Sequence, residues 1–244
     1  LIKRADEEEL KKDEKKEEIY NIAFLGKLRD LFFHPNSFLN RIEKENEYTP
    51  IFRFFVLFYA SYLAIVLIIS FLMKNITISQ AIVGFIQGVI MSVAIVFIIP
   101  AIAYFGIIII GGRGKFFNTF KPVVYSLVLW TMYLFFIFVS SLIFPFDTSA
   151  FQNYLQGAQN LNEIGSLMVQ FLIKNIGALV NFVITISMLI HVCAFAIKGI
   201  AKFQNIPKWK AAFSVILTLA VIIALWIFLI MALISQNPNL LPTQ

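Results

Sequence analysis

Residues 81–110 read AIVGFIQGVIMSVAIVFIIPAIAYFGIIII, thirty consecutive residues without a charged side chain. A helix of this length extends about 45 Å at 1.5 Å per residue. A bilayer core of about 30 Å requires only about 20 apolar residues. The segment therefore predicts a transmembrane helix that tilts, bends or protrudes. Pro100 marks the expected bend, because proline deprives the carbonyl four residues earlier of its helical donor.

Four further apolar runs of similar length accompany this segment, and none shows the polar alternation of a membrane barrel strand. Hydrophobic residues make up 59% of the chain and the mean hydropathy is +0.82. A soluble domain of 244 residues could not bury that much apolar surface. The predicted fold class is all-α, a polytopic membrane protein with a bundle of five transmembrane helices. The predicted spans are residues 51–73, 81–110, 122–144, 171–197 and 211–234.

The first fifty residues have a different character. Residues 1–18 carry six Lys/Arg and eight acidic residues, which favours a solvated tail over a helix that docks on a partner. From Ile19 to Phe33, apolar residues recur at three- and four-residue spacing, which predicts an amphipathic helix in the headgroup region. Pro35 ends it. Residues 19–50 are therefore predicted to be interfacial helices on the cytoplasmic side.

The connecting segments predict the orientation of the chain. After the N-terminal tail, twelve Lys/Arg residues fall in the segments predicted to lie inside, and two, Lys74 and Lys174, in those predicted to lie outside. The positive-inside rule then places the N-terminus in the cytoplasm and the C-terminal tail, residues 235–244, outside. We expect a multi-pass protein of the cell membrane.

The longest predicted outer segment, Pro145–Gln170, contains no Lys or Arg. A stripe of apolar residues predicts a helix lying on the outer leaflet, and the alternative is a cover over a cavity. The stripe consists of Phe151, Tyr154, Leu155, Ala158 and Leu161.

The five predicted spans contain no acidic residue, which argues against aspartyl proteolysis and carboxylate ion relays. Ser187 and His191 share a helix face, but a nucleophile and its base usually come from different elements. Cys193 is the only cysteine, so no intramolecular disulfide forms. We expect no enzymatic activity, no catalytic residues, no metal site and no cofactor.

Small residues spaced by four predict close helix packing. They are Gly84, Gly88 and Ser92 on the second span, and Gly177, Asn181 and Thr185 on the fourth. Packing within one bundle is favoured over homodimerisation. The polar intramembrane candidates are Gln87, Asn181 and His191.

Basic and aromatic residues border the predicted inner loops. Gly111–Lys115 lacks the Ser/Thr and the glycine spacing of a phosphate-binding loop, so a tight turn is the better interpretation. The residues predicted to contact lipid headgroups are Arg113, Lys115, Lys198, Lys202, Lys208 and Trp209. Because this charge borders membrane spans, nucleic acid is not an expected partner.

The interval from Phe33 to Ile234 resembles the Yip-domain (Ypt-interacting protein) family, specifically its prokaryotic branch. The resemblance rests on His34-Pro35-Asn36-Ser37-Phe38, the order of five spans, Gly111-Gly112-x-Gly-x-Phe116 and the Tyr125-Ser126 pair. It implies a five-helix bundle with a cytoplasmic N-terminal region. Eukaryotic members bind prenylated Rab-type GTPases and help to shape or sort membranes. Their acidic-leucine-aromatic-glycine-proline motif is absent here, where His34–Phe38 stands in roughly its place.

Two functional hypotheses follow. The first is a non-enzymatic membrane-organising or partner-binding component that acts on anionic lipid headgroups at the cytoplasmic side or on another membrane protein. The second is a transporter or channel for a small neutral or apolar solute or a lipid. The second hypothesis predicts a mid-membrane cavity lined by Gln87, Asn181, Thr185 and His191.

Overall fold

The computed structural model describes residues 24–145, 167, 169–173 and 175–236. This part of the chain consists of helices and connecting segments, without strands. The chain divides into two compact units, residues 1–54 and 55–244. The predictions for the tails 1–18 and 237–244, and for nearly all of the outer segment 145–170, fall outside the described residues.

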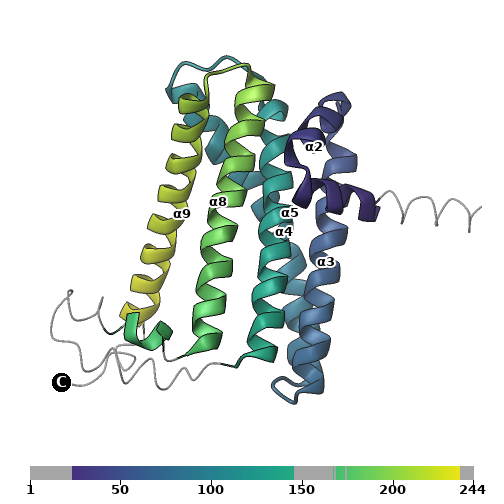
Figure 1. Ribbon diagram of the computed structural model, residues 1–244, viewed down its shortest axis with the longest axis vertical. Helices are drawn as coiled ribbons and strands as arrows, with labels where there is room; N and C mark the ends of the chain where they lie inside the picture. Colours follow the sequence, from purple (N-terminus) through teal and green to yellow (C-terminus); the bar gives the residue numbers. More distant parts are fainter. Residues whose placement is uncertain (1–23, 146–166, 168, 174, 237–244) are drawn as a thin grey trace, which may run out of the picture. The chain divides into compact units, whose positions relative to one another are not determined.

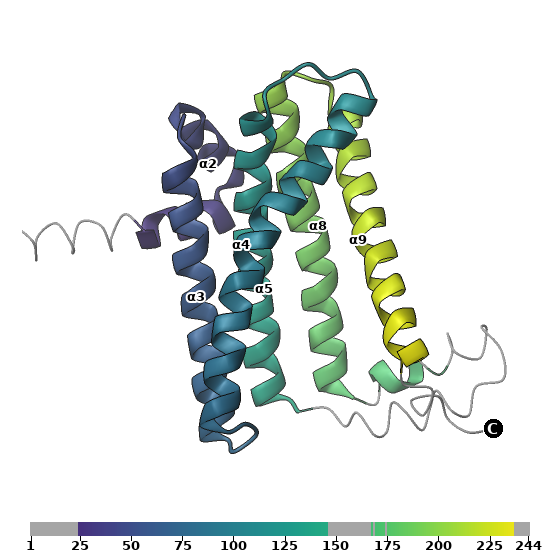
Figure 2. The same ribbon diagram turned by 180° about the vertical axis from the view of Figure 1, so that it is seen from behind.

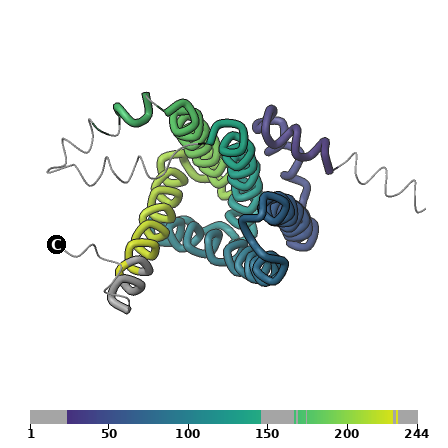
Figure 3. The backbone as a smooth tube through the Cα atoms, turned by 90° about the horizontal axis from the view of Figure 1, so that it is seen from below, coloured from purple at the N-terminus to yellow at the C-terminus, as the bar shows by residue number. Residues whose placement is uncertain are grey.

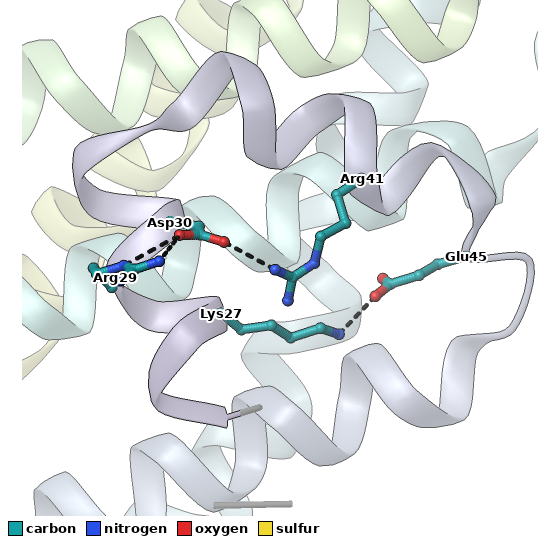
Figure 4. Close-up of polar contacts among 5 residues, drawn as sticks. All are labelled: Lys27, Arg29, Asp30, Arg41 and Glu45. Atoms are coloured by element: carbon teal, nitrogen blue, oxygen red, sulfur yellow. Dashed lines mark hydrogen bonds and ion pairs between the residues drawn. The ribbon is translucent and has the colours of Figure 1, made fainter. Parts of the chain in front are cut away.

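The first unit is a set of short helices held by ion pairs. Residues 24–33 are helical, and α2 (Pro35–Arg41) and the 3₁₀ helix η1 (Ile42–Lys44) follow. Lys27 Nζ lies 2.6 Å from a carboxylate oxygen of Glu45, and an Arg41 nitrogen lies 2.8 Å from Asp30 (Figure 4). Asp30 also accepts from Arg29 at 3.1 Å. These pairs join the helix at 24–33 to the α2–η1 segment.

The predicted helix from Ile19 to Phe33 is described only from Phe24 onwards, and this part is helical. Its Leu31 side chain is fully buried, whereas Leu25 and Phe33 are exposed. The position of this helix in a membrane interface remains a prediction.

Five helices of the described chain are long and apolar enough to cross a membrane, which confirms the predicted fold class. They extend beyond the apolar runs at most ends, because polar terminal residues continue the helical backbone. The fourth begins five residues later than predicted, where the Asn175 side chain accepts a hydrogen bond from the Ala178 N–H at 3.1 Å. The helices are α3 (Tyr48–Leu72), α4 (Ile78–Ile109), α5 (Phe116–Ile143), α8 (Ile176–Gln204) and α9 (Lys208–Gln236).

Within the second unit, four of these helices form a closed ring. The helix α4 contacts α5, α5 contacts α8, α8 contacts α9, and α9 contacts α4 again. Figure 1 shows α5, α8 and α9 side by side, and Figure 3 shows the ring seen along the helices. Buried apolar residues fill one end of its interior, near the α4–α5 and α8–α9 connections. They are Ala103, Ile107, Val123, Ala196, Ile200, Ala211 and Val215.

The long helix α4 changes neighbours along its length. A Cβ placed on Gly88 would lie 2.5 Å from Leu63 of α3, so the first half of α4 approaches α3 closely. Beyond Pro100, the Ser214 hydroxyl of α9 donates to the Ala103 carbonyl at 2.5 Å. Figure 2 shows the C-terminal part of α4 leaning toward α9. The proline stands between the two contacts, as expected of a bend point.

Candidate functional site

Both connections at one end of the ring carry exposed cations. The α4–α5 connection and the α8–α9 connection lie at the same end, at the top of Figure 1. The predicted headgroup residues gather here, and all of them are exposed. Trp209 keeps 64% of its surface accessible. We call this set the basic end: Arg113, Lys115, Lys198, Lys202, Lys208 and Trp209.

The glycine-rich connection of the basic end is fixed by donors from three helices. Tyr104 of α4 donates its hydroxyl to the Gly114 carbonyl at 3.0 Å. Gln204 of α8 donates its amide to the Lys115 carbonyl at 2.9 Å. Lys210 of α9 donates to the Ile110 carbonyl at 3.0 Å. The turn that presents Arg113 and Lys115 is therefore held by hydrogen bonds.

Gly114 leaves room for the Gln204 side chain. A Cβ at this position would overlap the Gln204 side chain, which also donates to the Thr119 hydroxyl at 2.6 Å. The sequence predicted the turn but not its donors. The available signal was an uncharged glutamine, Gln204, in the basic inner loop that follows the fourth predicted span.

Lys121 differs from the other cations near this end, because only 3% of its surface is accessible. Its ammonium lies 4.6 Å from the centre of the Phe203 ring and 5.2 Å from that of Phe117. Aromatic faces attract cations, so these rings favour the charged side chain in this place. The sequence placed Lys121 among the cations of an inner loop, whereas the structure buries it.

Two of the small residues on α4 and α8, Gly88 and Gly177, lie very close to a neighbouring element, whereas Gly84 makes an ordinary contact. Gly84 and Gly88 face Leu67 and Leu63 of α3, and Gly177 lies against the Phe144 carbonyl at the end of α5. Ser92 is almost fully buried and donates its hydroxyl to the Val89 carbonyl at 2.7 Å. All these contacts are made within one chain.

The polar candidates do not converge on one point. Asn181 donates its amide to the Ser141 hydroxyl of α5 at 3.0 Å, and Thr185 donates to the Asn181 carbonyl at 2.8 Å. His191 Nδ1 lies 3.1 Å from the Tyr133 hydroxyl of α5. Gln87 is exposed on α4, as is Ser187 on α8. Asn181 and His191 thus serve two separate α5–α8 contacts rather than a shared site.

A cavity of about 290 Å³ lies inside the bundle. The four residues predicted to line a mid-membrane cavity are not among those that line this one. Its wall is almost entirely apolar and comes from all five long helices. The lining is Phe55, Tyr59, Ile95, Ile99, Ala103, Val123, Ser126, Leu127, Trp130, Thr131, Leu134, Leu189, Val192, Cys193, Ala196, Val215, Thr218, Leu219 and Ile222.

Besides the Tyr59 phenol, three hydroxyl groups line this wall, and all three are engaged within their own helices. Ser126 donates to the Val123 carbonyl at 2.6 Å. Thr131 donates to the Leu127 carbonyl at 2.9 Å, and Thr218 to the Ser214 carbonyl at 2.8 Å. Their protons are therefore not available to a polar occupant.

Comparison with family models matches residues 29–229 to the Yip1 domain. Comparison with curated proteins and with solved structures gives no match. The matched interval includes α2, α3, α4, α5, α8 and most of α9, and thus both the basic end and the cavity.

Proposed function

The chain belongs to the Yip1-domain family, and on this premise we propose that it is a non-enzymatic membrane-organising protein. Its basic end gathers anionic lipids. The same end binds another membrane protein, either directly or through these lipids. The observation that carries the proposal is the concentration of five exposed cations and an exposed tryptophan at one end of the four-helix ring.

The chemistry of these side chains suits an anionic membrane surface. Each Lys or Arg near such a surface contributes about 1 kcal/mol of attraction. Trp209 is amphipathic and suits the headgroup level. Because Arg113 and Lys115 lie on a turn held from three helices, their backbone is already ordered before a headgroup binds.

The asymmetry of charge also supports an orientation. We place the basic end in the cytoplasm, with the N-terminus inside and the C-terminus outside the cell membrane, since inner loops carry the excess of Lys and Arg. The His34–Phe38 segment, in place of the acidic motif of eukaryotic members, supports assignment to the prokaryotic branch.

The transporter alternative draws on one observation, the apolar cavity. A path for a solute must reach both sides of the membrane. Most of the lining residues lie in the half of the bundle nearer the basic end, and we therefore rank transport second.

The test compares lipids that co-purify with the full chain in mild detergent, quantified by mass spectrometry. The variant K198Q/K208Q removes two exposed cations of the basic end, and K74Q removes an exposed cation from the opposite connection. At about 1 kcal/mol per charge, each lost cation of the basic end should lower anionic-lipid enrichment about fivefold.

The expected result is a loss in K198Q/K208Q and little change in K74Q. Equal enrichment in all three proteins would contradict the lipid-gathering role. A stoichiometric protein partner that K198Q/K208Q alone releases would support the partner-binding arm of the proposal.

A further inference from the structure

The cavity begins close to the basic end of the bundle. Its lining starts at Ala103, six residues before the end of α4, and continues to Leu134, eighteen residues after the start of α5. At 1.5 Å per residue these positions lie about 9 Å and about 27 Å from the basic end.

A hydrocarbon core centred on the helices has its boundary between the helix ends and the cavity. The helices α5 and α8 have 28 and 29 residues, which corresponds to about 43 Å. A hydrocarbon core of about 30 Å leaves about 6 Å of helix outside it at each end. The cavity thus extends from just below the headgroups of the basic end to slightly past the middle of the bilayer, a depth that one acyl chain from that leaflet can span.

The chemistry of the wall selects an apolar occupant. The hydroxyls of Ser126, Thr131 and Thr218 are donated to carbonyls of their own helices, and the remaining lining is aliphatic or aromatic apart from Cys193 and Tyr59. Engineered apolar cavities of about 150 Å³ stay dry and bind apolar ligands. A larger cavity of the same character, surrounded by lipid, favours a hydrocarbon chain over water or a polar solute.

We propose that this cavity is a binding site for one acyl chain of a phospholipid from the leaflet at the basic end. The volume of about 290 Å³ suits part of such a chain. A methylene group is about the size of a water molecule, whose share of liquid volume is about 30 Å³, so about ten methylenes fit. The inference goes beyond headgroup attraction, because it does not depend on the headgroup charge.

Trp130 offers a reporter inside the cavity. The other two tryptophans, Trp209 and Trp226, are exposed, and the variant W209F/W226F leaves Trp130 as the only one. The full chain is reconstituted in phosphatidylcholine vesicles whose acyl chains carry bromine, a contact quencher of tryptophan. In this background V192F fills the cavity, and V183F adds the same bulk on an exposed face of α8. A Trp226-only protein reports contact with bulk lipid.

We expect strong quenching of Trp130 that V192F largely removes and V183F preserves, while Trp226 is quenched equally in every background. Unchanged quenching in V192F would overturn the site. In a competition experiment, a brominated free fatty acid quenches Trp130 and added phosphatidylcholine should relieve this quenching. If phosphatidylcholine does not relieve it, the occupant is not a phospholipid. Since phosphatidylcholine has no net charge, these outcomes are independent of the anionic-lipid test with K198Q/K208Q.

Cys193, the only cysteine, provides a second readout if V192F fails to fold. In detergent, a small maleimide should alkylate Cys193 more slowly after phosphatidylcholine is added, because the acyl chain covers the thiol. Identical alkylation rates with and without the phospholipid would also overturn the proposal.

Discussion

The hydroxyl of Tyr133 on α5 lies 3.1 Å from Nδ1 of His191 on α8, and the two rings meet edge to face with centroids 6.0 Å apart. An ionisable group within a membrane span is costly unless it has a partner. Tyr133 supplies a partner for His191 in the neighbouring helix. The contact gives His191 a packing role at the α5–α8 interface, whereas Ser187 on the same helix is exposed.

The first prediction concerns this contact. Tyr133→Phe should lower the free energy of unfolding by about 0.6 kcal/mol, the average for hydrogen bonds between membrane helices. Thermal unfolding in detergent, followed by circular dichroism, measures the change, and Ser187→Ala on the exposed face of α8 is the control. A variant of unchanged stability that loses lipid or partner binding would instead point to a direct functional role for the pair.

A second prediction addresses the other polar contact between α5 and α8. Asn181 donates its side-chain amide to the Ser141 hydroxyl at 3.0 Å. A double-mutant cycle with Asn181→Ala and Ser141→Ala should give a coupling energy between about 0.5 and 1.5 kcal/mol. Additive effects of the two substitutions would show that the hydrogen bond contributes nothing to the interface.

The five-helix fold could be predicted from the sequence because hydropathy acts locally. A run as apolar as residues 81–110 is stable in a bilayer, and its length identifies it as a transmembrane helix. The N-terminal boundary of α8 was harder to predict, because the apolar run begins at Phe171 but Asn175 forms the cap of the helix. A local hydrogen bond outweighed the hydropathy signal there.

The sites were only partly predictable. Exposed cations at loop ends, such as Arg113 and Lys202, follow from the positive-inside pattern, and the structure places them together. The burial of Lys121 between Phe117 and Phe203 depends on helix rotation, which a single sequence does not fix. The sequence predicted a cavity lined by Gln87, Asn181, Thr185 and His191, because polar residues within a span often mark a solute path. The wall of the observed cavity consists mainly of apolar side chains, which carry no such signal.

The ion pairs of the first unit provide a third prediction. Glu45→Gln should loosen the helix at residues 24–33, because Lys27 loses the carboxylate at 2.6 Å. Both side chains are about one-fifth exposed, so the cost should stay near or below about 1 kcal/mol and shrink at high salt. Limited proteolysis of this helix measures the change. The charge-swapped variant K27E/E45K should recover part of the protection against proteolysis. If it is cleaved as fast as Glu45→Gln, the ion pair does not stabilise this helix.

The fourth prediction separates two glycines that share one sequence pattern. A Cβ on Gly177 would collide with the backbone carbonyl of Phe144, whereas a Cβ on Gly84 would lie 3.6 Å from Leu67, an ordinary contact. A backbone carbonyl cannot move aside as a side chain can. Gly177→Ala should therefore cost about 1–3 kcal/mol, the range for overpacking. Gly84→Ala should be neutral or slightly stabilising, because alanine favours helix by about 1 kcal/mol over glycine. The midpoint of thermal unfolding in detergent distinguishes the two variants. Equal losses of stability would mean that both glycines act as close-packing sites. A neutral Gly177→Ala would show that the start of α8 shifts freely relative to α5.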